Sequence, residues 1–154
     1  MITLVVDGLP IPWKAPYVGS RGAFSPRYKE KEQIKWQLRS QFNKTPFSTP
    51  VWCEFVFYMP IPKATSNVRR IQMLNGVMHH CKRPDRTNLA KFYEDCLIGI
   101  VIEDDAQIVA GNIRKIYGEI PRTVIKIIEM KKSVFHMTVT CRIFVFFHKI
   151  RGVA

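Results

Sequence analysis

Acidic residues are scarce in this chain, and their scarcity sets the first constraint on its function. The 154 residues include 12 Asp and Glu against 24 Lys and Arg, which gives a formal net charge of +12 and a pI near 9.8. So strong a positive field favours a polyanionic partner, with nucleic acid ahead of a membrane surface. Charge alone does not identify a substrate, because ribosomal and membrane-peripheral proteins are also basic.

Cysteine is sparse too, and the sequence does not open with a signal peptide. None of the 4 cysteines stands in C-x-x-C spacing: they are Cys53, Cys81, Cys96 and Cys141. This pattern argues against a disulfide scaffold and predicts a cytoplasmic protein whose cysteines are small buried hydrophobic residues. The run from His79 to Cys81 lacks the paired ligand spacing of a zinc site.

Long apolar runs, repeats and low-complexity linkers are also missing. A membrane-spanning helix needs about twenty predominantly apolar residues, and no stretch of this sequence offers them. No long amphipathic helix is visible either, which disfavours a peripheral membrane protein. An apolar content of 47% in 154 residues instead predicts one globular domain with a substantial core.

The hydrophobic pattern predicts an α+β fold with a mixed sheet of four to five strands and two or more helices. The predicted strands are 2–7, 51–59, 108–117, 122–130 and 135–147. The predicted helices are 27–42, opened by Pro26, and 88–98, which follows Pro84. The proline-rich segment before Pro26 and the polar segment 63–76 are predicted to be exposed connections.

The few acids gather around the second predicted helix, between Arg83 and Gln107. Asp85 precedes this helix, and the run from Glu103 to Asp105 follows it closely enough to fold back toward Asp85. Hard divalent cations such as Mg²⁺ are held by one or two carboxylates, so clustered acids in a basic protein indicate phosphodiester hydrolysis. The alternative is ordinary, since a lone acid at a helix start is usually a cap and an acidic run is usually a solvated turn.

The helix itself divides into two stripes. The apolar stripe has the 3, 4, 7 spacing of a face turned to the core and consists of Leu89, Phe92, Tyr93, Cys96 and Leu97. Asn88, Lys91 and Asp95 share a neighbouring polar stripe. The helix is therefore expected to bury one side and present the other near Asp85.

These residues resemble the RusA family of Holliday junction resolvases, which are crossover junction endodeoxyribonucleases. The resemblance rests on P-D-x-x-N-L-x-K from Pro84, E-D-x-L-x-G from Glu94, D-D-A-Q-I-V from Asp104 and a basic residue at Lys115. It extends to G-x-P-x-P-W-K near the start of the chain and to F-S-P-R-Y-K-E after it. It implies a single RusA-like domain over residues 1–154, in which 1–130 resembles the family and 131–154 adds a C-terminal strand.

The resemblance also implies a site. Asp85, Lys91 and Asp105 would be catalytic, and Asp85, Asp104 and Asp105 would bind Mg²⁺ or Mn²⁺. The family motif commonly has a second aspartate where this chain has Thr87, so the chain brings one negative charge fewer. Further site candidates are Thr87, Asn88, Asp95 and Gln107.

The implied activity is structure-selective cleavage of four-way DNA junctions in recombination and repair, by a homodimer that makes paired nicks. Candidate DNA contacts are Lys14, Arg21, Arg69, Arg70, His80, Lys82, Arg83 and Lys115. For Arg69 and Arg70 the alternative is simple solvation. The competing hypothesis is a non-catalytic protein that binds branched DNA or RNA.

Overall fold

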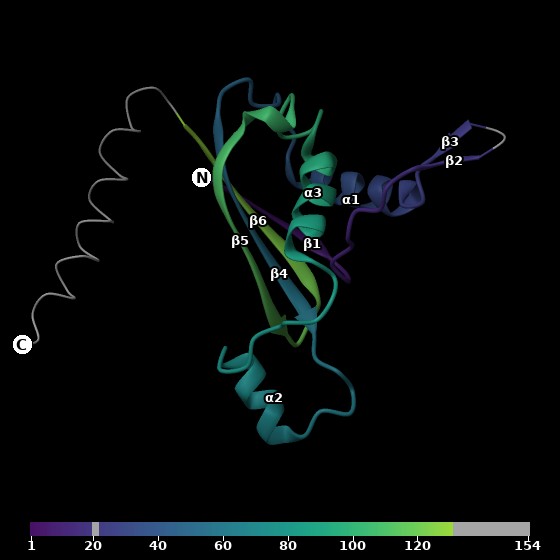
Figure 1. The fold of residues 1–154 in the computed structure, drawn as a ribbon. Helices are drawn as coiled ribbons and strands as arrows, with labels where there is room; N and C mark the ends of the chain where they lie inside the picture. Colours follow the sequence, from purple (N-terminus) through teal and green to yellow (C-terminus); the bar gives the residue numbers. More distant parts are fainter. Residues whose placement is uncertain (20–21, 131–154) are drawn as a thin grey trace, which may run out of the picture.

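The computed structural model describes residues 1–19 and 22–130. The predicted strand 135–147, Cys141 and the candidate DNA contact Arg21 lie outside the described residues. The rest forms a single α+β domain, as predicted, in which a mixed four-stranded sheet carries two helices on one face (Figure 1).

The sheet is built from β1 (Ile2–Asp7), β4 (Val51–Pro60), β5 (Ile108–Gly118) and β6 (Arg122–Glu129). Its order is β1-β6-β4-β5, with β6 antiparallel to both of its neighbours and β4 parallel to β5. A parallel pair cannot be joined by a hairpin and needs a long crossover. Here the crossover contains α2 (Asn67–Leu74) and α3 (Arg86–Leu97), so the topology requires the stretch that holds the predicted site to cross the sheet.

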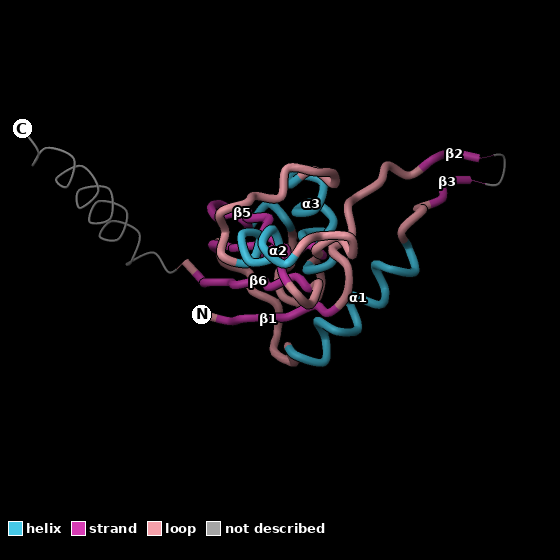
Figure 2. Tube along the Cα trace, turned by 90° about the horizontal axis from the view of Figure 1, so that it is seen from below, coloured by secondary structure: helices cyan, strands magenta, loops and turns pink. Residues whose placement is uncertain are grey.

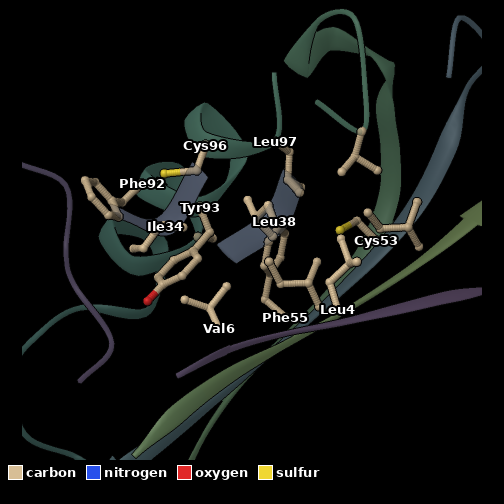
Figure 3. Packing of buried hydrophobic residues seen from close by; sticks show 14 of the residues in the cluster. Leu4, Val6, Ile34, Leu38, Cys53, Phe55, Phe92, Tyr93, Cys96 and Leu97 are labelled. Carbon is tan, nitrogen blue, oxygen red and sulfur yellow. The ribbon is translucent and has the colours of Figure 1, made fainter. Parts of the chain in front are cut away.

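The core lies between the sheet and the helices α1 (Tyr28–Gln41) and α3. Figure 3 shows Ile34 and Leu38 of α1 and Tyr93 of α3 packed above Phe55 of β4. The rings of Tyr93 and Phe57 lie 5.4 Å apart. The predicted apolar stripe of α3 is confirmed, because every one of its members is buried.

The opposite face of the sheet carries charge at its centre. Glu54 alternates with the core residues of β4 and therefore points away from the helices. Its carboxylate pairs with Arg114 of β5 at 2.8 Å and with Lys126 of β6 at 3.2 Å. This acid on an open face is 8% exposed and is satisfied by basic residues from both neighbouring strands.

Three local predictions were wrong. The segment before Pro26 is not wholly irregular, because β2 (Tyr17–Gly19) and β3 (Gly22–Phe24) form an antiparallel ribbon that projects from the domain (Figure 2). The connection 63–76 contains α2, whose Met73 is buried. Cys81 is exposed rather than buried, although Cys53 and Cys96 are buried as expected.

Along the described part of the chain, none of the helices combines the length and the apolar character that crossing a membrane requires.

Candidate functional site

The first turn of α3 presents Asp85 to solvent. Asp85 is the N-cap residue, with an extended backbone (φ −71°, ψ 146°), but its side chain makes no capping hydrogen bond. Thr87 and Asn88 are also exposed, and neither they nor Asp85 satisfies the free N–H groups of the first turn through a cap. The carboxylate of Asp85 thus makes no hydrogen bond to the helix that it begins. This contradicts the alternative in which Asp85 serves only as a helix cap.

Lys91 is held above Trp13, a residue of the amino-terminal loop. The backbone N–H of Trp13 donates to the carbonyl of Asn88 at 2.8 Å, which ties the loop to the start of α3. The ammonium nitrogen of Lys91 then lies 3.9 Å from the centre of the Trp13 ring. A cation over an indole face is attracted by the ring quadrupole. Trp13 therefore orients the side chain of Lys91. Lys91 nevertheless remains exposed to solvent.

The loop that leads into Asp85 is held by β5. The Lys115 ammonium donates to the backbone carbonyls of Lys82, at 2.7 Å, and of Pro84, at 2.8 Å. The His80 ring packs on Tyr117 with ring centres 4.9 Å apart. Burial lowers the pKa of His80, and the positive charge of Lys115 lowers it further. The structure thus brings His80 and Lys115, both candidate DNA contacts, into one packed cluster.

The acidic turn between α3 and β5 is a short 3-10 helix, η1 (Asp105–Gln107). Asp104 caps it by accepting a hydrogen bond from the backbone N–H of Ala106 at 2.8 Å. The Gln107 side-chain oxygen accepts from the backbone N–H groups of Glu103 and Asp104, and its amide donates to the Phe47 carbonyl at 2.9 Å. Asp104 and Gln107 therefore build the turn, whereas Asp105 is an exposed carboxylate at its start.

Glu94 is a candidate that the sequence analysis did not single out. It is half-buried on α3. Burial raises its pKa, and the negative charges of Asp105 and Asp95 raise it further. The neighbouring Asp95, a sequence-derived candidate, instead pairs with Lys31 of α1 at 3.5 Å. The proximity of Glu94 to Asp105 arises from the return of the chain after α3, and no spacing in the sequence signals it.

The structure does not gather the three predicted metal ligands into one group. Asp85 begins α3, whereas the carboxylate of Asp105 lies close enough to Glu94, in the second half of that helix, to raise the pKa of Glu94. Figure 1 shows the chain leaving α3 for β5 at the end opposite the one where it entered. Among residues 1–19 and 22–130, no three or more His, Cys, Asp or Glu side chains are arranged to hold a metal ion.

The donor chemistry nevertheless fits Mg²⁺. Asp85 and Asp105 offer exposed carboxylate oxygens, which are hard donors. Mg²⁺ is commonly held by one or two carboxylates together with waters and substrate phosphates, and does not need an all-protein cage. A site of this open kind is compatible with the described residues, whereas a preformed site containing Asp85, Asp104 and Asp105 is not.

The remaining basic candidates for DNA contact differ in whether an acidic side chain already pairs with them. Arg70 pairs with Glu119 at 3.2 Å, and Arg69 is exposed on the same helix, α2. Lys14, Lys82 and Arg83 are exposed on the loops that flank the start of α3. Arg83 and His80 also line a cleft of about 630 Å³ between these loops and α1. Positive charge thus surrounds Asp85 and Lys91.

Replacing Glu94 by Gln is expected to raise the melting temperature at pH 7. The raised pKa means that folded Glu94 binds more protons than unfolded Glu94 above about pH 4.5, so its contribution to stability falls as pH rises through that window. Glutamine removes this effect. Thermal melts between pH 4 and 7 should therefore show that the stability advantage of Glu94→Gln over the parent protein grows as the pH rises.

The matched control is Glu103→Gln, which makes the same change on an exposed side chain and should leave the melting temperature at pH 7 close to that of the parent. A Glu94→Gln variant that is less stable than the parent at pH 7 would show that the charge of Glu94 is favourable, in contradiction to its raised pKa.

The chain resembles known proteins over the region that contains the site residues described above. Residues 7–128 match the family described as endodeoxyribonuclease RusA. The uncharacterized protein YqaN of Bacillus subtilis (strain 168) is 30% identical over 89 residues, which are 56% of this chain and 63% of that protein. The match thus spans less than two thirds of this relative's length. The family match, by contrast, includes Asp85, Lys91, Asp105 and Lys115, and on this basis the chain belongs to the RusA endodeoxyribonuclease family.

Proposed function

We propose that this protein is a structure-selective endonuclease that resolves four-way DNA junctions by Mg²⁺-dependent cleavage of phosphodiester bonds, in recombination and repair. The observation that carries the proposal is the start of α3. It presents Asp85 without a capping bond and Lys91 within two turns of it, on a helix whose apolar stripe is buried. Membership of the RusA family supports the assignment of substrate.

The residues of this chain have distinct roles in the proposed reaction. Asp85 and Asp105 would supply carboxylate oxygens to Mg²⁺, and Mg²⁺ when bound polarises a phosphate and lowers the pKa of a water. Lys91, fixed over Trp13, neutralises negative charge that builds on the phosphate oxygens during cleavage. The free N–H groups at the start of α3 also attract phosphate, because a helix N-terminus carries partial positive charge.

Thr87 gives this site a lower negative charge than the common family motif. Thr87 is exposed on α3, about one turn before Lys91 in the chain. Its hydroxyl can donate to a phosphate oxygen or accept from a water. It cannot replace the charge of an aspartate. The proposed site therefore depends more heavily on Asp85 and Asp105 than a site with two motif aspartates would.

The proposed assembly is a homodimer. Resolution of a four-way junction requires nicks in two strands, and a symmetric pair of subunits supplies two equivalent sites through one isologous interface. The net charge of +12 suits a partner that carries phosphates on four arms.

A second candidate function is binding of branched DNA without cleavage. Two observations favour it: Thr87 stands at the place of a motif aspartate, and the described residues contain no group of three or more acidic, His or Cys side chains arranged to hold a metal ion. Both functions predict tight binding that depends on salt, so affinity does not separate them. Cleavage does.

Incubation of the purified protein with an end-labelled four-way junction tests the proposal. Symmetric nicks are expected in Mg²⁺ and should disappear in chelator, and a linear duplex of the same sequence should remain intact. Binding without nicks in either Mg²⁺ or Mn²⁺ would overturn the enzyme and leave the binding protein. A lack of preference for the junction over the duplex would remove both.

A further inference from the structure

Lys115 lies on the side of the sheet that faces the helices. It pairs in register with Phe57, a core residue of β4, and precedes the buried Tyr117 by two positions on β5. Residues two apart on a strand share a face. The stem of Lys115 therefore runs along the helix-covered face of the sheet, and its ammonium emerges near the end of β5.

Near the end of β5 the ammonium of Lys115 forms hydrogen bonds with the backbone of another segment. It donates to the carbonyl oxygens of Lys82 and Pro84, at 2.7 and 2.8 Å. These carbonyls lie 33 and 31 residues away in the chain and flank Arg83. A charged donor makes shorter and stronger hydrogen bonds than a neutral one. An ammonium has three N–H donors and no acceptor. The two carbonyls of the protein therefore occupy two of the three donors of Lys115.

The second of these carbonyls belongs to the peptide group that joins Pro84 to Asp85. A peptide group is planar, so fixing its oxygen fixes the plane from which the backbone of Asp85 departs. The helix then continues from the carbonyl of Asp85, which accepts from the N–H of Leu89 at 3.1 Å. Lys115 thus fixes the backbone immediately before Asp85, and the buried helix α3 fixes the backbone immediately after it.

We propose that Lys115 is a positioning residue for Asp85. It holds the loop 82–84 against β5 and thereby sets the place of the Asp85 carboxylate, rather than serving as a contact to DNA phosphate. The proposal rests on the function proposed above for Asp85. It revises the interpretation of Lys115 as a DNA-binding residue, because the ammonium is committed to carbonyls of its own chain.

The decisive variant is Lys115→Met, which keeps an unbranched stem but removes every donor. Lys115→Arg restores donors and is the rescue variant. Lys126→Met is the matched control, because Lys126 lies on the neighbouring β6 and its ammonium pairs with a side chain, Glu54, on the opposite face. Circular dichroism melts establish first that each variant is folded. If Lys115→Met does not fold, Lys115→Gln replaces it, since its shorter side chain cannot span both carbonyls.

Hydrogen exchange without DNA gives the first readout. Amides of the peptide that contains residues 80–90 should exchange faster in Lys115→Met than in the parent, and at the parental rate in Lys126→Met and nearly so in Lys115→Arg. Unchanged exchange in a folded Lys115→Met variant would overturn the proposal. This readout does not require cleavage, so it remains decisive even if the parent protein proves to have no nuclease activity.

The second readout compares cleavage with binding. The single-turnover nicking rate of Lys115→Met is expected to fall by about 10- to 100-fold, the scale on which residues that orient a metal-binding group act. Junction affinity in chelator, and its dependence on salt, should stay at the parental values. A salt slope reduced by about one, the change expected for a lost phosphate contact, would instead make Lys115 a DNA-binding residue.

Discussion

Replacing Asp85 by Asn is expected to lower the Mg²⁺-dependent nicking rate by about a hundredfold or more, because a weakened metal ligand puts at risk the several kcal/mol of charge stabilisation that a bound Mg²⁺ supplies. The change removes one negative charge and one strong oxygen donor but preserves shape. Asp85 makes no side-chain capping bond, so the variant should fold with nearly the parental stability. Junction binding in chelator should be unchanged or tighter, because a carboxylate beside the DNA has been neutralised.

Asp105→Asn is expected to reduce nicking to a similar extent, and the double variant distinguishes two arrangements. If both carboxylates act on one metal ion, their effects are not additive, and the double variant is little worse than either single variant. If α3 keeps them in separate sites, the fold-losses multiply. Full activity in either single variant would place the active site elsewhere. Glu103→Gln, in the same exposed turn as Asp105, is the control for a general loss of acidity.

The predictable parts of this fold are those whose signal is local. The helices α1 and α3 follow from apolar residues at helical spacing, bounded by Pro26, Pro84 and Gly99, and the four described sheet strands follow from alternation. In contrast, α2 has 8 residues, and Met73 is its sole buried member, so its periodicity is too short to detect. The ribbon β2–β3 forms among prolines and buries little, so no core pattern marks it.

The candidate site divides in the same way. Asp85, Thr87 and Lys91 fall on one short stretch, and their placement at the start of a helix could be predicted from Pro84 and the stripe behind it. The contacts that organise the site join distant segments of the chain. Trp13 reaches Lys91, and Lys115 reaches the carbonyls before Asp85.

Glu94 illustrates the limit most clearly. Its sequence position beside Asp95 suggests an ordinary solvated pair of acids. In the fold Glu94 is half-buried and lines a cleft with residues of β4 and β5, and the turn after α3 brings the negative charge of Asp105 close to it. The cap of η1 is local by contrast, because Asp104, a predicted metal ligand, and Gln107 have the spacing of a capping box, in which Asp104 accepts from the backbone N–H of Ala106. The environment of Glu94 therefore depends on the tertiary path of the chain after α3, whereas the bond of Asp104 follows from a pattern within residues 104–107.

Raising the salt concentration from about 50 to 200 mM is expected to weaken junction binding by about a thousandfold or more, assuming that six to ten phosphates are neutralised. The net charge of +12 and the exposed Lys14, Lys82 and Arg83 around the start of α3 motivate this magnitude. Fluorescence anisotropy of a labelled four-way junction, measured in chelator to prevent cleavage, gives the slope of log affinity against log salt.

Two arginines test where the phosphates lie. Arg83→Met should lower that slope by about one, because Arg83 is exposed beside Asp85 and each lost phosphate contact removes about one released counterion. Arg70→Met should change it little, since the guanidinium of Arg70 is already paired with Glu119. A slope near zero for the parent would exclude DNA as the partner and with it both proposed functions. Equal effects of the two substitutions would show that binding is spread over the basic surface, away from the start of α3.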